Sequence, residues 1–521
     1  MNGLLLASTE QGVSGAITGL FATMLVGLIL CLALEDKLHA KKSVIAGIFA
    51  IMCLLLGAIC GILPFDHVVV GSHEMTPAND VQGYYVVDTD AEHDHHDVVI
   101  DGTDDKELAG EDLELHVGGH RLEMPIYIPG INWGVIAIIL GSSLFVDVTS
   151  KSGLFTWVAI KVTKKSGGDP RKLLFAYGIM TVVFSAVLNN VTAMIIVGSL
   201  TAVSLEKLDR KDKLLGFLLI EGLLTNVGGL LTLISSVPNI IVGTTAGIGF
   251  VTFFIQSSPY VVVSTWLTLW MGARLFGVKK LATQDEQDQA AQLVASFDEN
   301  DGIESWGFFW FGTAMLVLFI ICIATASVLP GDIKHLGMGF IALAFAGLML
   351  IRYKSEVDNF YRSVDWDLLG FFMALFVVIY VMEHALVLAT IGGILETVLV
   401  DITGETAHVR DTIVLLIGSA GFSSVTDNIP LAAMLASILS DLGAPTAGGS
   451  GTESGLWWAV IFGANLGGNL TPIGSASTLV AVTIIHKHNL HMSFMAFVKS
   501  AIPFAIAQIG LAMVYVLLFL R

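Results

Sequence analysis

Charged residues are scarce in this chain, since only 14% of its 521 residues are Asp, Glu, Lys or Arg while 54% are hydrophobic. A soluble domain carries about 25% charged residues, so the composition excludes an ordinary water-soluble enzyme. Basic residues are the scarcer kind, 26 against 45 acidic ones, and the net charge of −19 argues against a nucleic-acid partner. The four cysteines lie in apolar stretches at spacings that fit no zinc or redox motif, so we expect small core residues.

Long apolar runs are abundant, and they predict helices that cross a membrane. Runs of about 20 apolar residues match the hydrocarbon thickness of a bilayer, and these runs do not alternate as the strands of a membrane barrel do. No basic segment precedes the first run, so we expect a retained helix rather than a cleaved signal peptide. The predicted class is an all-α polytopic protein of the cell (inner) membrane. Spans are expected near residues 15–34, 43–64, 131–148, 260–276, 306–329, 335–351, 367–383 and 499–520.

Four further apolar stretches are interrupted by Asn, Gly, Ser, Thr and Pro: 171–204, 215–245, 411–438 and 456–485. Basic residues gather in the loops that we place in the cytoplasm, whereas the acidic loop 65–129 is placed outside. The expected organisation is two N-terminal helices (1–64), an extracytoplasmic His-rich insertion (65–129), repeat 1 (130–276), a cytoplasmic linker (277–305) and repeat 2 (306–520). We expect a re-entrant hairpin at 171–204 and 411–438, and a broken helix at 215–245 and 456–485.

An internal repeat relates the interrupted stretches. Asn190 matches Asn428 at an offset of 238 residues. Asn226 matches Asn465 at an offset of 239 residues, within the sequence motifs NVGG and NLGG. The basic flanks of the first hairpin and the Lys- and Arg-free flanks of the second predict opposite orientations. An inverted repeat with discontinuous helices is typical of secondary transporters, which bind their substrate between the breaks. The alternative is that Gly and Asn merely permit tight helix packing.

Neutral oxygen donors gather at the breaks, as a hard cation such as Na⁺ prefers, while half-helix N-termini attract anions. The first predicted ion or substrate site comprises Ser185, Asn189, Asn190, Thr192, Thr225, Asn226, Thr232, Ser235 and Ser236. The second comprises Ser423, Ser424, Thr426, Asp427, Asn428, Asn465, Asn469, Thr471, Ser475 and Ser477. Na⁺ is expected at Asn190, Asn226, Asp427, Asn428 and Asn465. No other cofactor and no catalytic residue is predicted.

Asp427 is an acid inside an apolar hairpin, where a carboxylate is costly and a functional role is the default expectation. It could bind Na⁺ when ionised and a proton when empty; the alternative is a structural carboxylate held by backbone amides. Glu221, one turn before Thr225, is a candidate proton relay. We interpret Asp147 and Glu383 as solvated residues at the membrane interface. The seven histidines of loop 65–129 allow weak metal binding or pH sensing, although a solvated acidic loop explains them as well.

At these motifs the sequence resembles the ArsB/NhaD branch of the ion transporter superfamily, and more distantly the divalent anion/sodium symporters. The matching texts include SAVLNNVTAMII, TNVGGLLTLISSVPNIIVGTTAGIGF, SSVTDNIPLAAM and GANLGGNLTPIGSAST, and the resemblance covers roughly residues 130–520. It implies a homodimer with a scaffold domain and an elevator-type transport domain, and the text TDN implies a cation- and proton-binding role for Asp427. NhaD-like proteins usually have Asp where this chain has Asn189.

The favoured prediction is a sodium/proton antiporter that exports Na⁺ or Li⁺. The alternative is a Na⁺- or H⁺-coupled permease for an anion or oxyacid, such as arsenite or a di- or tricarboxylate. A membrane-embedded enzyme is disfavoured, because no nucleophile–base pair, Walker loop or HExxH motif appears. Ion identity, stoichiometry, the direction of coupling, the dimer contacts and the role of the histidine loop stay open.

Overall fold

The computed structural model describes residues 13–63, 68–70, 75–77, 85–87, 98–99, 114–116, 120–122, 127–128, 130–326, 336–354, 357–404, 406–426, 428–447 and 453–520. Two compact units divide the chain. Unit 1 comprises residues 1–28, 43–133 and 370–387, and unit 2 comprises residues 29–42, 134–369 and 388–521. Helices α1 (Gly15–Ala33) and α15 (Trp366–His384) pass through the boundary between them.

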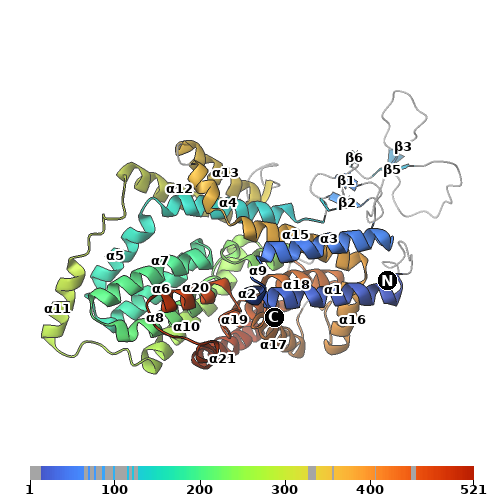
Figure 1. Ribbon diagram of the computed structural model, residues 1–521. Helices are drawn as coiled ribbons and strands as arrows, with labels where there is room; N and C mark the ends of the chain where they lie inside the picture. The colour runs from blue at the N-terminus through green and yellow to red at the C-terminus, as the bar shows by residue number, and fades with distance from the viewer. Residues whose placement is uncertain are drawn as a thin grey trace. The chain divides into compact units, whose positions relative to one another are not determined.

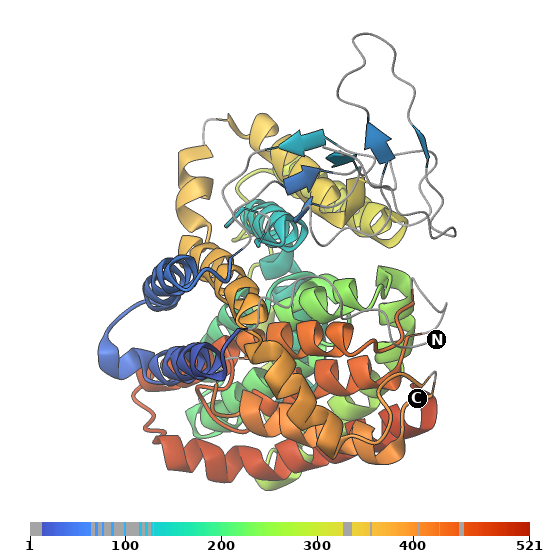
Figure 2. The same ribbon diagram turned by 90° about the vertical axis from the view of Figure 1, so that its right-hand side faces the viewer.

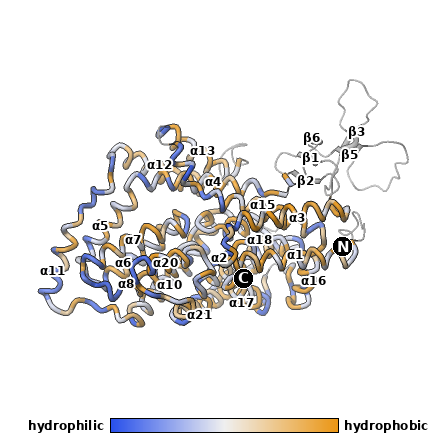
Figure 3. Tube along the Cα trace, in the orientation of Figure 1, coloured by the Kyte–Doolittle hydropathy of each residue, from blue (hydrophilic) through white to orange (hydrophobic). Residues whose placement is uncertain are grey.

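Unit 1 contains apolar helices and, in the long insertion, short strands. Its helix α3 (Lys42–Ile59) and helix α1 are coloured orange along nearly their whole length in Figure 3, as expected of lipid-facing helices. The described residues of the insertion form six strands: β1 (Val68–Val70), β2 (Met75–Pro77), β3 (Tyr85–Val87), β4 (Val98–Val99), β5 (Glu114–His116) and β6 (His120–Leu122). They form two antiparallel sheets, ordered β2-β1-β6 and β4-β3-β5. The helical prediction holds for the membrane-spanning part of the chain, and the described strands are confined to the insertion.

Unit 2 is helical among its described residues. In chain order its elements are α2 (Glu35–Leu38), α4 (Trp133–Ser150), α5 (Leu154–Ser166), α6 (Pro170–Val187), α7 (Asn190–Lys207), α8 (Lys211–Gly228), the 3₁₀ turn η2 (Leu233–Ser235), α9 (Val237–Thr245), α10 (Phe250–Leu275), α11 (Gln284–Ala295), α12 (Trp306–Ala324), α13 (Gly337–Arg352), α14 (Val357–Ser363), α16 (Val387–Val398), α17 (Val409–Ser423), α18 (Asn428–Asp441), α19 (Gly455–Gly467), α20 (Ala476–Lys487) and α21 (Phe494–Phe519).

Eight of the described helices are long and apolar enough to cross a membrane, namely α1, α3, α4, α6, α10, α12, α15 and α21. Three details differ from the sequence prediction. Helix α6 meets the length of a crossing although it was expected as a short hairpin arm, and α13 has only 16 residues. Helix α10 also begins ten residues before the expected span, because its N-terminal Ser, Gln and Pro residues lowered the hydropathy of the sequence without breaking the helix.

Helices recur in the same order in the two halves of the chain. Helices α6 to α9 are followed by α10, and α17 to α20 are followed by α21. Both α10 and α21 have 26 residues, and the internal prolines Pro259 and Pro503 are the tenth residue of each. Helices α6, α7, α8 and α20 lie side by side, as Figures 1 and 2 show, so the second half contributes a helix to the packing of the first.

The core of unit 2 is built on α8 and α19, which are the first halves of the two broken helices. Every residue of α19 is buried, and so is the run from Gly216 to Gly228 in α8. A helix that is buried all round is a central one. By contrast, α10 and α21 expose large apolar side chains such as Ile255 and Leu518, as expected of helices that face lipid. Among the cysteines only Cys53 is buried and the other three are half-buried, so the core expectation holds for one.

Candidate functional site

The first hairpin turns at Leu188 and Asn189, between the end of α6 and the start of α7. Asn189 caps α7, because its side-chain oxygen accepts a hydrogen bond from the Thr192 backbone N–H at 2.7 Å. The Asn189 side chain is exposed at the tip. The predicted ligand Asn189 thus uses its side chain to begin α7, while Thr192 contributes its backbone N–H to this bond.

The first broken helix leaves regular α geometry after Gly228 and resumes at Val237. Between these points the freed carbonyl groups are satisfied by polar side chains, as unwound backbone inside a membrane protein requires. The Ser235 hydroxyl lies 2.6 Å from the Gly229 carbonyl oxygen and 2.7 Å from that of Thr232. Asn239 donates its amide to the same two carbonyl oxygens, at 2.7 and 3.1 Å. The break is therefore an ordered, oxygen-rich turn.

The second hairpin and the second broken helix have the same construction. Helix α17 ends at Ser423 and α18 begins at Asn428, while α19 ends at Gly467 and α20 begins at Ala476. Asp427 lies outside the described residues, so its role stays a prediction.

Equivalent hydrogen bonds tie each hairpin to its broken helix. Ser185 donates to the Thr225 carbonyl at 2.7 Å, and Ser423 donates to the Ala464 carbonyl at 2.5 Å. A second pair joins the turns back to the hairpins: Thr232 donates to the Ala186 carbonyl at 2.6 Å, and Thr471 donates to the Ser424 carbonyl at 2.5 Å. The sequence offsets of 238 and 239 therefore correspond to a repeated set of contacts.

Glycines at the ends of α8 and α19 allow the helices to approach closely. A Cβ atom on Gly228 would lie 2.7 Å from the backbone of Val182, and one on Gly467 would lie 2.3 Å from the Ala420 carbonyl oxygen. Such distances leave no room for a side chain, so glycine is required at both positions. Val182 and Ala420 are themselves 238 residues apart, which extends the repeat to the packing.

Hydrogen bonds between the two halves join residues of the two predicted sites into two buried groups, one around Asn226 and one around Asn465. Asn226, from the first half, donates its amide to Asn469 Oδ1 at 2.8 Å and to Ser475 Oγ at 2.9 Å, both in the second half. In the reciprocal direction Ser236 donates to Asn465 Oδ1 at 2.7 Å. We call the two groups together the amide network; it comprises Ser185, Asn190, Asn226, Ser236, Asn239, Asn465, Asn469, Ser475, Ser477 and Gln508.

The amide network includes two residues that the sequence analysis missed. Asn465 donates to Asn239 Oδ1 at 2.8 Å, and Asn469 donates to Gln508 Oε1 at 2.8 Å. Gln508 in turn donates to Thr268 Oγ1 on α10 at 2.9 Å. A lone amide in the apolar run of α21 was the available signal for Gln508, since buried polar groups need a partner.

Other predicted residues lie outside the network. The hydroxyls of Ser424 and Thr426 donate to the carbonyl groups of Gly421 and Phe422 in their own hairpin arm. Asn428 is buried at the start of α18. Asp147 lies 3.5 Å from Lys151, one turn away on a partly exposed face, as the interfacial interpretation predicts.

Neutral groups dominate the electrostatics of the site. In the part of the chain that the structure describes, no Lys or Arg side chain bonds to the amide network. Helices α9 and α20 both begin inside it, at Ser236 and Ser475, so two helix N-termini offer partial positive charge there. The arrangement can hold a hard cation on amide, hydroxyl and carbonyl oxygens, and an anion at the two helix starts.

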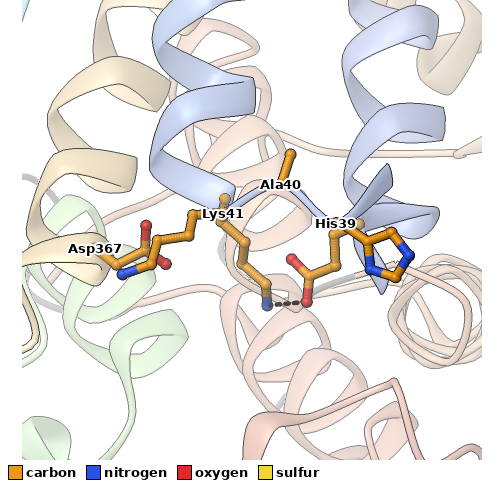
Figure 4. A pocket seen from close by; sticks show the side chains of 6 residues that line it. His39, Ala40, Lys41 and Asp367 are labelled. Carbon is orange, nitrogen blue, oxygen red and sulfur yellow. Dashed lines mark ion pairs between the residues drawn. The ribbon is translucent and has the colours of Figure 1, made fainter. Parts of the chain in front are cut away.

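A separate pocket of about 360 Å³ lies in unit 2 and shares no residue with the amide network. Glu35, His39, Ala40, Lys41, Lys42 and Asp367 line it (Figure 4). Lys42 and Glu35 form an ion pair at 3.7 Å. Its side chains mix both signs of charge at an exposed turn, so the amide network remains the better candidate site.

The fold and the comparisons together define a multi-pass membrane protein of the secondary transporter class, not an enzyme. A family model described as citrate transporter matches residues 116–463. The chain belongs to this citrate transporter family.

Two relatives and one solved structure are similar to the chain. The 46 kDa membrane protein of Mycobacterium leprae is 32% identical over 388 residues, 74% of this chain and 86% of that protein. The P protein of Mus musculus is 25% identical over 471 residues, 78% of this chain and 56% of that protein. The crystal structure of the YdaH transporter of Alcanivorax borkumensis, described as having an unusual topology, is similar with a TM-score of 0.50 and 14% identity, over 76% of this chain and 87% of that one.

Proposed function

We propose that the protein is a Na⁺-coupled permease for a small carboxylate or oxyacid anion. The carrying observation is the amide network, in which neutral oxygens and two helix N-termini meet at the interruptions of both broken helices. A bound Na⁺ would neutralise the charge of the anion beside it. It would thus supply the positive charge that no Lys or Arg side chain supplies in the described site. Membership of the citrate transporter family supports a carboxylate cargo.

The proposed cycle moves the network across the membrane with its helices. The hairpins α6–α7 and α17–α18 would enter the membrane from opposite sides as re-entrant elements, and the unit that contains them would move as an elevator against a scaffold in a homodimer. The location would be the cell (inner) membrane. Cysteines placed singly at the hairpin tips, at Asn189 and Thr426, test the orientation through labelling from each side. Labelling of both tips from one side only would contradict the inverted arrangement.

Sodium/proton antiport is the second candidate, and the observation that favours it is Asp427 between Thr426 and Asn428. A carboxylate at that tip could exchange a proton for Na⁺. The ArsB/NhaD resemblance supports the same role.

One assay separates the candidates. Proteoliposomes that contain the purified protein are given an inward Na⁺ gradient, and uptake of radiolabelled citrate is measured beside the response of an internal pH dye. Uptake that needs Na⁺ supports the permease, whereas a Na⁺-dependent pH change without citrate or another anion supports antiport. Absence of both responses, with a panel of carboxylates and arsenite, would contradict both candidates.

A matched pair of variants tests the site. Asn226→Ala removes the amide that joins the two halves and should lower Na⁺-dependent uptake at least tenfold. Thr483→Ala removes an exposed hydroxyl that bonds within α20 and should leave uptake unchanged. Equal uptake by the two variants would place the transported ion elsewhere.

A further inference from the structure

Glu221 is a carboxyl group buried in the middle of α8 without a charged partner. Its exposed fraction is 0%. Oε1 accepts a hydrogen bond from Thr201 Oγ1 on α7 at 2.6 Å, while Oε2 has no hydrogen-bond partner among the described residues. An isolated ionised carboxylate in such surroundings is very unfavourable, and a buried acid there is held neutral by a proton or by a cation.

Buried hydroxyl groups continue from Glu221 toward the C-terminal end of α5. Thr201 lies one turn from Ser204 on the same face of α7. Ser204 Oγ accepts from the Tyr177 hydroxyl on α6 at 2.7 Å, and that hydroxyl lies 2.6 Å from Thr163 Oγ1 on α5. All of these side chains are fully buried. We call Thr163, Tyr177, Ser204 and Thr201 the hydroxyl track.

Most other titratable groups on the helices that pack against α8 lie at the ends of those helices. Tyr177 is the titratable side chain that interacts electrostatically with it. Tyr260 lies within α10 and donates to the Gln508 carbonyl. The remaining charged or titratable groups of α6, α7, α8, α10 and α20 lie in first or last turns, and α19 has none: Arg171, Lys172, Glu206, Lys207, Lys211, Asp212, Lys213, Arg274, His486 and Lys487. Within the described chain, Glu221 is thus the one carboxyl group enclosed by this helix cluster.

Glu221 also lies close to the proposed cation site. It precedes Thr225 by one helical turn, and the Thr225 carbonyl accepts from Ser185, which itself lies 2.6 Å from Asn190 Oδ1. The four residues from Glu221 to Thr225 rise about 6 Å along the helix. A cation at these oxygens would favour the ionised form of Glu221, so cation binding and proton binding should oppose each other.

We propose that Glu221 is a proton-binding site, at the inner end of the hydroxyl track, that loses its proton when a cation binds beside Thr225. In the binding step a solvent proton forms a bond to one carboxylate oxygen, and in the release step the same proton returns to water. The cation-linked part rests on the proposed function, whereas proton binding itself does not. Glu221 is therefore a coupling group separate from Asp427.

Infrared difference spectroscopy of the full-length protein in lipid nanodiscs tests proton binding directly. Between about pH 5 and pH 9 the wild type should show a carboxylic acid C=O band that disappears as the pH rises. Glu221→Gln should remove that band, and the control Glu206→Gln, an exposed acid at the end of α7, should keep it. No titrating band in the wild type, or the same band in Glu221→Gln, would overturn the proposal.

Thr201→Val keeps the test valid if Glu221→Gln does not fold. The variant preserves side-chain shape but removes the donor to Glu221, so the ionised form loses a hydrogen bond and the midpoint should move up by about one pH unit. The control Thr265→Val removes a hydroxyl that bonds within α10 and should not move it. A midpoint that is the same in both variants would contradict the assignment.

Addition of NaCl, with choline chloride as control, tests the link to the cation. At a separation of about 6 Å and an effective dielectric constant of about 20, bound Na⁺ should weaken proton binding by about 100-fold, a shift of about two pH units. A midpoint that does not respond to Na⁺ would refute the coupling while the band still establishes the proton site. If citrate and Na⁺ transport both fail but the band titrates as described, the proposed function fails and the proton site stands.

Discussion

Replacement of Gly467 by alanine tests the close contact between α19 and α17 on which the second half of the site depends. The added Cβ would lie 2.3 Å from the Ala420 carbonyl oxygen and 2.7 Å from its Cα. Ordinary contacts of this kind need about 3.3 Å, so the two helices must separate by about 1 Å. Because both close atoms belong to the backbone, a rotamer change cannot relieve the overlap.

The separation would also lengthen two hydrogen bonds of the site. The bonds from Ser423 to the Ala464 carbonyl and from Thr471 to the Ser424 carbonyl are both 2.5 Å long, and an added 1 Å brings them to the limit of hydrogen bonding. Overpacking costs about 1–3 kcal/mol, and each hydrogen bond between membrane helices contributes about 0.6 kcal/mol. We expect Gly467→Ala to lower the free energy of unfolding by about 2–4 kcal/mol.

Gly418→Ala on α17 is the matched control, because a Cβ there meets nothing within 4 Å. Gly418→Ala gains up to about 1 kcal/mol of helix propensity in the interior of α17, and Gly467→Ala gains no more than this at the end of α19, so a net loss of stability in Gly467→Ala reports the contact. Tryptophan fluorescence during unfolding in detergent measures stability, and Na⁺-driven citrate uptake measures function. Gly467→Ala with the stability and uptake of Gly418→Ala would refute the close-contact reasoning.

Three further predictions concern single side chains. Asn189→Asp should preserve the cap of α7, and the negative charge at the helix N-terminus should stabilise the helix by up to about 1 kcal/mol. The variant should change the cation stoichiometry or the pH optimum of uptake. If neither changes, the first hairpin tip has no role in coupling. The hydrogen bond from Lys164 holds the pKa of Glu299 below the ordinary value of 4.5, so this tie should persist above pH 4.5 and be lost as the pH falls through the lowered pKa. Lys164→Met should therefore raise hydrogen exchange around Glu299 relative to the wild type at neutral pH, and the difference should vanish below the lowered pKa. Equal exchange in the two proteins at neutral pH would contradict the tie. Backbone N–H donors at the start of α11, Thr283 first, lower the pKa of Glu286, so Glu286→Ala should speed amide exchange in the first turn of α11 only; uniform exchange along the helix would contradict the capping role.

Hydropathy and the internal repeat could be read from the sequence because they depend on local chemistry. Long apolar runs must lie in lipid or in a core whatever their neighbours are, and the recurring Asn and Gly residues kept their spacing in both halves. The same offsets reappear in the bonds from Ser185 and Ser423 to the carbonyl groups of the broken helices.

Only the tertiary structure decided which polar groups pair with which. A sequence cannot distinguish one Asn from another, because an amide bonds to any donor or acceptor that long-range packing brings within reach. Asn226 therefore bonds across the repeat to Asn469 and Ser475 instead of serving a separate first site, and Asn189 caps a helix. The burial of Glu221 likewise depends on the helices that pack around α8 and not on its own sequence neighbours, because those helices come from both halves of the chain.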